Sequence, residues 1–298
     1  MIALVDLWPL LNRIGWSLPL FVIAFAALWF AKLFYQWTEQ FNFSDQLTEK
    51  DNPAFGTALT GYLIGTTIAM TGAFVAMDAV VDGATLLSAC ASVAGQGLLV
   101  ALLMRAGVLI LSRGILYRFG VRDEMVRDRN VGAGAVVAGG CIATGLVLRA
   151  ALSGQSDSVS AGVRDVLVYW AVGQAILVIG AWLFVKAVRF DIHKALEVDN
   201  NASAGFSMGG FLVAVGITVN AALKDASSDI AHELVITLVC SVIGLGLLVC
   251  GAIIAARAFL PESPMAKEIS VDKNPAAGLI SAGCFIAVAL LLARVITL

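Results

Sequence analysis

Charged residues are scarce in this sequence: Asp, Glu, Lys and Arg together make up 13% of its 298 residues. A soluble domain carries about 25% charged residues, so the charge needed to cover a water-facing surface is missing. Hydrophobic residues account for 60% of the chain, and the mean hydropathy is +0.92. The composition therefore predicts a polytopic membrane protein and excludes a soluble enzyme or a disordered chain.

Side chains that bind metals and cofactors are also few. The two histidines, His193 and His232, have no second His or Cys at ligand spacing, and the five cysteines lie in apolar runs without a CxxC pair. We therefore expect no disulfide framework, no metal and no cofactor. The 19 basic and 21 acidic residues provide no large basic field, which excludes nucleic acid as a partner.

Eight stretches are apolar enough to cross a bilayer, which requires about 20 residues per helix. Residues 1–17, with Trp8 and Trp16, are predicted instead to form an interfacial segment at the level of the headgroups. The spans are predicted near Leu18–Tyr35, Ala54–Met77, Ala84–Leu111, Val131–Leu152, Val163–Val188, Ala202–Leu223, Leu234–Ala258 and Pro275–Leu298.

The basic residues predict an orientation. Of the 19 Lys and Arg, 14 lie in the loops and helix ends that join the first span to the second, the third to the fourth, the fifth to the sixth and the seventh to the eighth, and 5 lie on the other side. Short loops rich in Lys and Arg stay in the cytoplasm. We therefore expect those four loops to be cytoplasmic and both termini to lie across the membrane.

A motif of one Asn and two Gly recurs four times, once after each of these basic loops. Gly follows the Asn four and nine positions later, and successive copies are 78, 71 and 73 residues apart. Each copy opens the second span of a pair, and a pair of spans returns the chain to its starting side, so all four pairs share one orientation. The four sets are Asn52/Gly56/Gly61, Asn130/Gly134/Gly139, Asn201/Gly205/Gly210 and Asn274/Gly278/Gly283.

These repeats predict an all-α bundle of eight transmembrane helices, built from four parallel two-helix repeats in two halves, 18–152 and 163–298. The Asn is expected to cap its helix, because its side-chain oxygen accepts a backbone N–H of the first turn. The glycines allow close helix packing, so the four motif spans should form the inner bundle. A cation site is a less favoured alternative, since an acidic residue precedes each Asn by one or two positions: Asp51, Asp128, Asp199 and Asp272.

The sequence Asn-Pro-Ala-x-Gly at Asn52 and at Asn274 resembles the YjfL-like family of bacterial inner membranes, also called domain of unknown function 350. The resemblance covers nearly the whole chain as two tandem copies. Asn130 and Asn201 depart from the pattern because no Pro follows them. The resemblance implies a protein of the bacterial inner membrane without established biochemistry, and in that membrane the termini predicted by the basic residues would be periplasmic. It also implies a likeness to families linked to envelope-stress proteins and to spermidine-ligase-like enzymes.

Polar residues within the spans suggest one candidate site. Arg105 lies eight residues, or about 12 Å, further into its helix than Arg113. Charges at such depth tend to face a bundle interior or water. Arg105, Gln96 and Asn220 are therefore candidates for a polar path, and the alternatives are an interfacial Arg105 and ordinary polar contacts between helices.

The loop from Ser112 to Asn130 mixes apolar residues with five arginines. Such a segment suits the cytoplasmic membrane surface, where anionic headgroups attract basic side chains. The alternative is that the arginines only set the topology of the chain. The five are Arg113, Arg118, Arg122, Arg127 and Arg129.

Residues Gly205–Gly209 match the GxSxG string of serine hydrolases, but both histidines fall outside the predicted spans, so we expect no enzyme activity. Two functions remain. The first is a non-enzymatic inner-membrane module that organises the membrane or docks a partner, linked through the resemblance to envelope stress. The alternative is a passive channel or permease for a small ion or solute. Expected partners are membrane lipids, and a cytoplasmic protein or further copies of the chain stay open.

Overall fold

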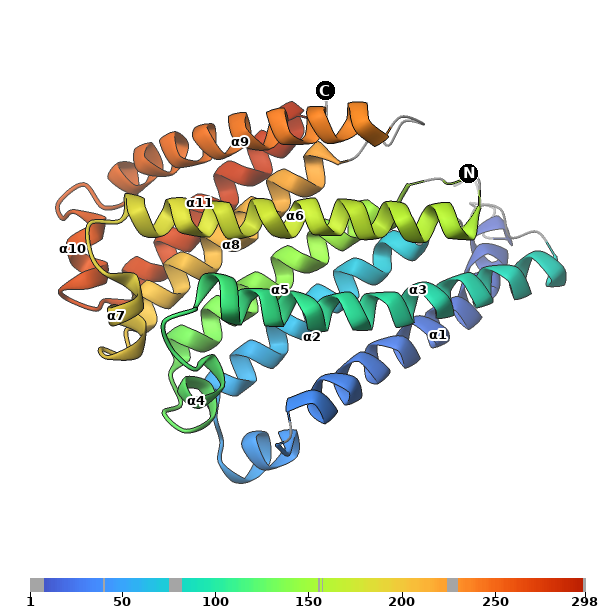
Figure 1. Ribbon diagram of the computed structural model, residues 1–298, viewed down its shortest axis with the longest axis horizontal. Helices are drawn as coiled ribbons and strands as arrows, with labels where there is room; N and C mark the ends of the chain where they lie inside the picture. Colours follow the sequence, from blue (N-terminus) through green and yellow to red (C-terminus); the bar gives the residue numbers. More distant parts are fainter. Residues whose placement is uncertain are drawn as a thin grey trace, which may run out of the picture.

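The structure is a computed structural model and describes residues 8–39, 41–74, 82–154, 156, 158–223 and 230–296. Across these residues the chain forms eight long helices and no strand (Figure 1). This architecture confirms the predicted all-α bundle. The long helices are α1 (Trp8–Glu39), α2 (Pro53–Ala73), α3 (Gly83–Ile110), α5 (Val131–Leu152), α6 (Val159–Ala187), α8 (Ala202–Ala222), α9 (Ile230–Phe259) and α11 (Pro275–Ile296).

Seven of the eight long helices are apolar enough to cross a membrane, and α2 is not among them. This helix carries a series of threonines. The hydroxyls of Thr57, Thr60 and Thr67 each donate to the backbone carbonyl four residues earlier in α2, at 2.7, 2.8 and 2.8 Å. Because these hydroxyls are satisfied within the helix, α2 can still lie in a bilayer without exposing unpaired donors.

The short connecting helices lie together at one end of the bundle, called the loop side below (Figure 1). Helices α2, α5, α8 and α11 begin at the loop side, and α3, α6 and α9 return to it (Figure 1). The four pairs α1–α2, α3–α5, α6–α8 and α9–α11 therefore share one orientation, as predicted for parallel repeats. The short elements are η1 (Asp45–Glu49), η3 (Leu111–Ile115), α4 (Val121–Val126), α7 (Ile192–Glu197) and α10 (Met265–Ser270).

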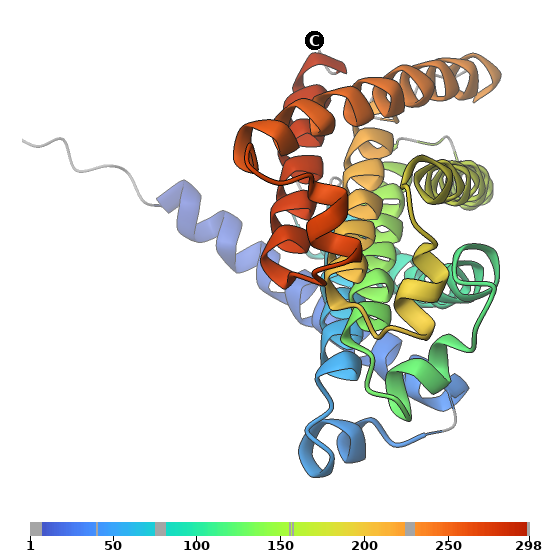
Figure 2. The ribbon, with the colours of Figure 1, turned by 90° about the vertical axis from the view of Figure 1, so that its left-hand side faces the viewer.

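Helices α2, α5, α8 and α11 lie side by side in chain order and form what we call the inner row (Figure 2). Neighbours in this row pack more extensively than any other pair of helices. A second layer lies over its grooves: α3 packs on α2 and α5, α6 on α5 and α8, and α9 on α8 and α11, while α1 packs mainly on α3. The predicted inner bundle is thus a row with two buried members and two edges: 78% of the most apolar part of α5 and of α8 is buried, against 17% for α11.

Three helices, α1, α6 and α9, begin at least four residues earlier than the hydropathy predicted, and α6 begins at Val159 instead of Val163. α1 runs without a break from Trp8, so residues 8–17 continue the first span instead of forming a separate segment, and residues 1–7 lie outside the described part. α9 begins at Ile230, which brings His232 and the buried Glu233 into its first turns, where the Tyr169 hydroxyl donates to Glu233. Hydropathy identifies only the apolar part of a helix. The helix itself can extend beyond that part, because its backbone hydrogen bonds do not require apolar side chains.

The expected orientation can be tested by cysteine labelling of intact cells in a background without native cysteines. Ser156 lies between α5 and α6, and Ala266 lies in α10 beside Met265. Ser156→Cys should react with a membrane-impermeant maleimide, and Ala266→Cys should react only after permeabilisation. The reverse pattern would overturn the orientation. A position near Ser227 is also expected to react from outside, but it falls outside the described residues.

Candidate functional site

The four motif asparagines occupy equivalent positions at the N-termini of the inner-row helices. The Asn130 side-chain oxygen accepts the backbone N–H of Ala133 at 3.0 Å, and Asn201 accepts that of Ala204 at 3.1 Å. Asn52 and Asn274 cap α2 and α11 in the same way. The residue before each Asn has a positive φ, which turns the chain into the helix: 46° at Asp51, 52° at Arg129, 47° at Asn200 and 48° at Lys273.

Each of the first three asparagines also joins its unit to the next one. The side-chain amide of Asn52 donates to the carbonyl of Met125 at 2.9 Å, that of Asn130 to Leu196 at 2.5 Å and that of Asn201 to Ile269 at 2.7 Å. Asn274 belongs to the last of the four motifs, and its amide donates to Glu268 of its own loop at 3.0 Å. Sequence reasoning missed this second bond, although the constant spacing of the four asparagines was a signal for it.

The first motif glycine of each helix faces the preceding helix of the row. A methyl group on Gly134 would lie 2.3 Å from the carbonyl oxygen of Ala54, and one on Gly205 would lie 2.2 Å from that of Gly132. Gly278 has the same relation to Ser203, at 2.4 Å. Such distances leave no room for a side chain, so these helices touch through their backbones.

The second motif glycine faces the following helix. A methyl group on Gly61 would lie 2.2 Å from Cα of Ala138, and one on Gly139 would lie 2.2 Å from the carbonyl oxygen of Gly209. One on Gly210 would lie 2.3 Å from Cβ of Ala282. Two glycines differ: Gly56 on α2 has only Leu47, at 3.8 Å, and Gly283 on α11 has no atom within 4 Å. These two face outward at the two edges of the row.

The alternative of a cation site at the helix N-termini is not supported. Within the described part of the chain, no group of three or more His, Cys, Asp or Glu side chains could hold a metal ion. Asp128 pairs with Arg127 at 2.8 Å, and Asp199 pairs with Lys273 at 3.2 Å. These carboxylates therefore already have cationic partners.

Arg105 lies in a buried polar cluster between α3 and the end of α1. Its Nη2 is 2.8 Å from Oε1 of Glu39, and its Nε donates to the Thr38 hydroxyl at 2.6 Å. The guanidinium lies 5.3 Å from the centre of the Tyr35 ring, and the residue is 9% exposed. The ion pair with Glu39 and the contact with the Tyr35 ring explain how the charge of Arg105 is tolerated inside the bundle, since a charge at such depth needs partners of this kind.

A recess of about 430 Å³ opens beside this cluster, between the ends of α1 and α3 and the connection to α4. Arg113 and Arg122 line it and are exposed, whereas Arg105 forms part of its buried wall. Glu39 is the carboxylate among the lining residues. The recess therefore combines three cations with one anion, and we take it as the candidate functional site.

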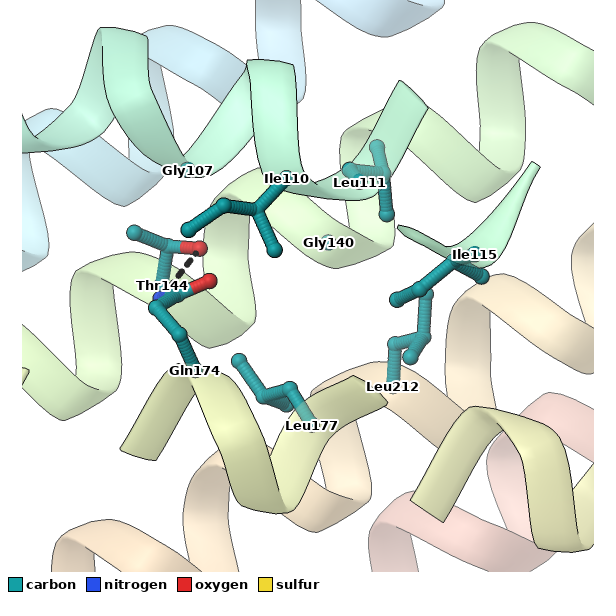
Figure 3. A pocket seen from close by; sticks show the side chains of 9 residues that line it. All are labelled: Gly107, Ile110, Leu111, Ile115, Gly140, Thr144, Gln174, Leu177 and Leu212. Atoms are coloured by element: carbon teal, nitrogen blue, oxygen red, sulfur yellow. Dashed lines mark hydrogen bonds between the residues drawn. The ribbon is translucent and has the colours of Figure 1, made fainter. Parts of the chain in front are cut away.

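Gln96 and Asn220, the other members of the expected polar path, do not join Arg105. The Gln96 amide donates to Ser92 at 3.2 Å, and Asn220 accepts from Arg149 at 3.3 Å. Closer to the centre of the bundle, the Gln174 amide donates to Thr144 at 3.1 Å beside a space of about 10 Å³, shown in Figure 3. Such a space holds about one water molecule.

The basic loop uses most of its apolar residues inside the protein. Ile115 and Leu116 are 3% and 0% exposed. These apolar side chains therefore pack inside the protein, and they do not need a lipid surface to be buried. Arg118 pairs with Asp191 at 2.8 Å. The backbone N–H of Lys194 and this guanidinium lower the pKa of the Asp191 carboxyl. Arg127 and Arg129 are exposed on the same side of the bundle.

Ser207 of the GxSxG string is buried, and its hydroxyl lies 2.7 Å from that of Ser281 between α8 and α11. The histidines lie elsewhere: His193 is in α7, and His232 is near the start of α9. Within the row, the two serines provide a polar contact between helices.

Paired spans in tandem, capped by Asn and packed through Gly, define a multi-pass helical membrane protein built from repeats. The chain belongs to the family described as Domain of Unknown Function (DUF350), whose model matches residues 9–152 and again residues 158–296. No curated protein and no solved structure matches the chain. The first copy holds the helices from α1 to α5, and the second holds those from α6 to α11.

Proposed function

We propose that this protein is a non-enzymatic module that organises the bacterial inner membrane by associating head to tail with further copies of itself. The edge helix α11 of one copy would pack against the edge helix α2 of the next. The observation that carries this proposal is that one interface joins successive units three times within the chain, and each edge of the row presents one unused half of it.

The free face of α11 repeats the face that α8 turns toward α11. Ala276 and Gly283 have the same positions after Asn274 that Ser203 and Gly210 have after Asn201. Ser203 donates to the carbonyl of Asn274, and Gly210 meets Ala282, so the α8 positions are filled by contacts. Ala276 and Gly283 are exposed.

The free face of α2 repeats the face that α5 turns toward α2. Gly56, Thr60 and Thr67 have the positions after Asn52 that Gly134, Ala138 and Gly145 have after Asn130. The three α5 residues contact α2, whereas Thr60 and Thr67 are exposed. Gly and Thr are among the small residues through which membrane helices associate.

A contact between two different faces of identical chains builds rings when it closes and filaments when it does not. The half-exposed amide of Asn274, which lacks the carbonyl partner of the other three asparagines, lies at this edge. A neighbouring copy would supply an equivalent carbonyl. The loop side would stay free for anionic headgroups or for a cytoplasmic partner, including one linked to envelope stress.

Cysteine crosslinking tests this assembly in membranes, in a background without native cysteines. Within the chain a methyl group on Gly216 would lie 2.6 Å from Cα of Ala143. The equivalent pair between copies is Thr67 of one chain and Ala287 of the other. A chain with both Thr67→Cys and Ala287→Cys should form a ladder of oxidised oligomers, and each single variant should stay monomeric.

A crosslinked dimer from either single variant would show a symmetric contact and contradict the head-to-tail arrangement. Absence of the ladder at native expression levels would contradict assembly altogether. The channel hypothesis has less support, because the Thr144–Gln174 space in the bundle has room for about one water. Flux of small ions through liposomes with the monomeric protein would favour the channel instead.

A further inference from the structure

We propose that the recess beside Arg105 binds a phosphate-bearing group, which is either the headgroup of an anionic lipid or a free phosphate. This site is separate from the row edges, so it does not depend on the proposed assembly. The argument rests on the charges, the open hydrogen-bond capacity and the size of the recess.

The charge balance of the recess favours an anion. Glu39 neutralises Arg105 at 2.8 Å, and this pair leaves Arg113 and Arg122 as surplus positive charges. Neither Arg113 nor Arg122 has an ion-pair partner among the residues that the structure describes. Arg122 lies 5.4 Å from the centre of the Phe41 ring, which holds its guanidinium beside the recess.

The buried wall of the recess carries an unsatisfied donor. Nη1 of Arg105 is buried and has no hydrogen-bond partner, while Nε and Nη2 are bonded to Thr38 and Glu39. A buried donor without an acceptor destabilises the protein, so an incoming acceptor oxygen would be favoured. Arginine matches phosphate oxygens particularly well, because its planar fork offers several N–H donors in fixed directions.

The size and place of the recess suit a headgroup. Its volume of about 430 Å³ lies within the usual range for small-molecule pockets, about 300–1,000 Å³. It opens at the loop side, where the span of α3 ends, and Tyr117 and Phe119 line it beside the arginines. A phosphate would meet exposed Arg113 and Arg122 first and then the buried Arg105.

Binding can be measured with the full-length purified protein by native mass spectrometry. The probes are phosphatidylglycerol, phosphatidylcholine and inorganic phosphate, each added to delipidated protein in neutral detergent. The test variant is Arg113→Gln with Arg122→Gln, whose side chains are exposed and should not affect folding. The matched control is Arg127→Gln with Lys267→Gln, which removes the same charge from exposed positions on the same side of the bundle but outside the recess.

Wild-type protein should retain phosphatidylglycerol in preference to phosphatidylcholine. The recess variant should bind phosphatidylglycerol about 30-fold more weakly, as expected for the loss of two well-placed cations, and the control should bind like wild type. If inorganic phosphate displaces phosphatidylglycerol, a free phosphate is sufficient for binding. If it does not, the recess requires the lipid. Equal weakening in both variants would overturn the proposal, and so would the lack of a preference for the anionic lipid together with the lack of binding of inorganic phosphate.

Discussion

Replacing Gly139 by alanine should destabilise the protein by about 1–3 kcal/mol, the usual effect of overfilling a close-packed contact. The added methyl group would lie 2.2 Å from the carbonyl oxygen of Gly209, and a helix backbone cannot move aside as a side chain can. The effect should appear as earlier thermal unfolding of the purified protein in detergent, followed by circular dichroism.

The matched control is Gly283→Ala, the same change at an equivalent motif position with no atom within 4 Å. Its unfolding temperature should be equal to or slightly above that of the wild type, because Ala favours a helix over Gly by about 0.5–1 kcal/mol. Gly180→Ala provides a second control in α6, since its nearest contact, Val215 at 3.5 Å, is an ordinary one. If all three variants unfold alike, backbone contact in the row does not limit stability.

Arg105→Leu should lower the free energy of unfolding by about 3–5 kcal/mol, because it leaves the Glu39 carboxylate buried without its partner. The side chains of Arg105 and Glu39 are only 11% and 16% exposed, so water cannot replace the lost contact fully. The double variant Arg105→Leu/Glu39→Leu removes both charges and should recover much of this loss. The measurement is denaturant unfolding in detergent of wild type, both single variants and the double variant.

Additive effects of the two single variants would show that the pair is not coupled in the folded protein. Wild-type behaviour of Arg105→Leu would show that the guanidinium reaches the membrane surface instead of Glu39. Arg105→Lys should be intermediate, since an ammonium can pair with Glu39 but does not reproduce the planar fork that also reaches Thr38.

The helices and their repetition could be predicted from the sequence because both are local properties. An apolar stretch of sufficient length marks each span, and the fixed offsets of Asn130, Gly134 and Gly139 recur in every unit. The order of the inner row is not local. Four similar motifs do not reveal that Gly56 and Gly283 lie at edges while Gly139 lies between two helices, since that difference depends on neighbours.

The candidate site was predicted in part. The depth of Arg105 indicated that it needs a partner, but Glu39 lies 66 positions earlier in the chain and has no periodic relation to it. Only the packing of α1 on α3 brings the two together. The basic loop poses a similar difficulty, because burial of Leu116 inside the fold cannot be distinguished in sequence from insertion into a lipid surface.

The contact between α5 and α8 joins the two family copies, and it is of the same kind as the contact between α2 and α5 within one copy. Residues 153–158 connect α5 to α6 and so tether the second copy to the first. A tether this short turns a bimolecular association into an intramolecular one, with an effective concentration in the millimolar range. Fusion of two copies in one chain therefore keeps this contact formed even when the protein is dilute in the membrane.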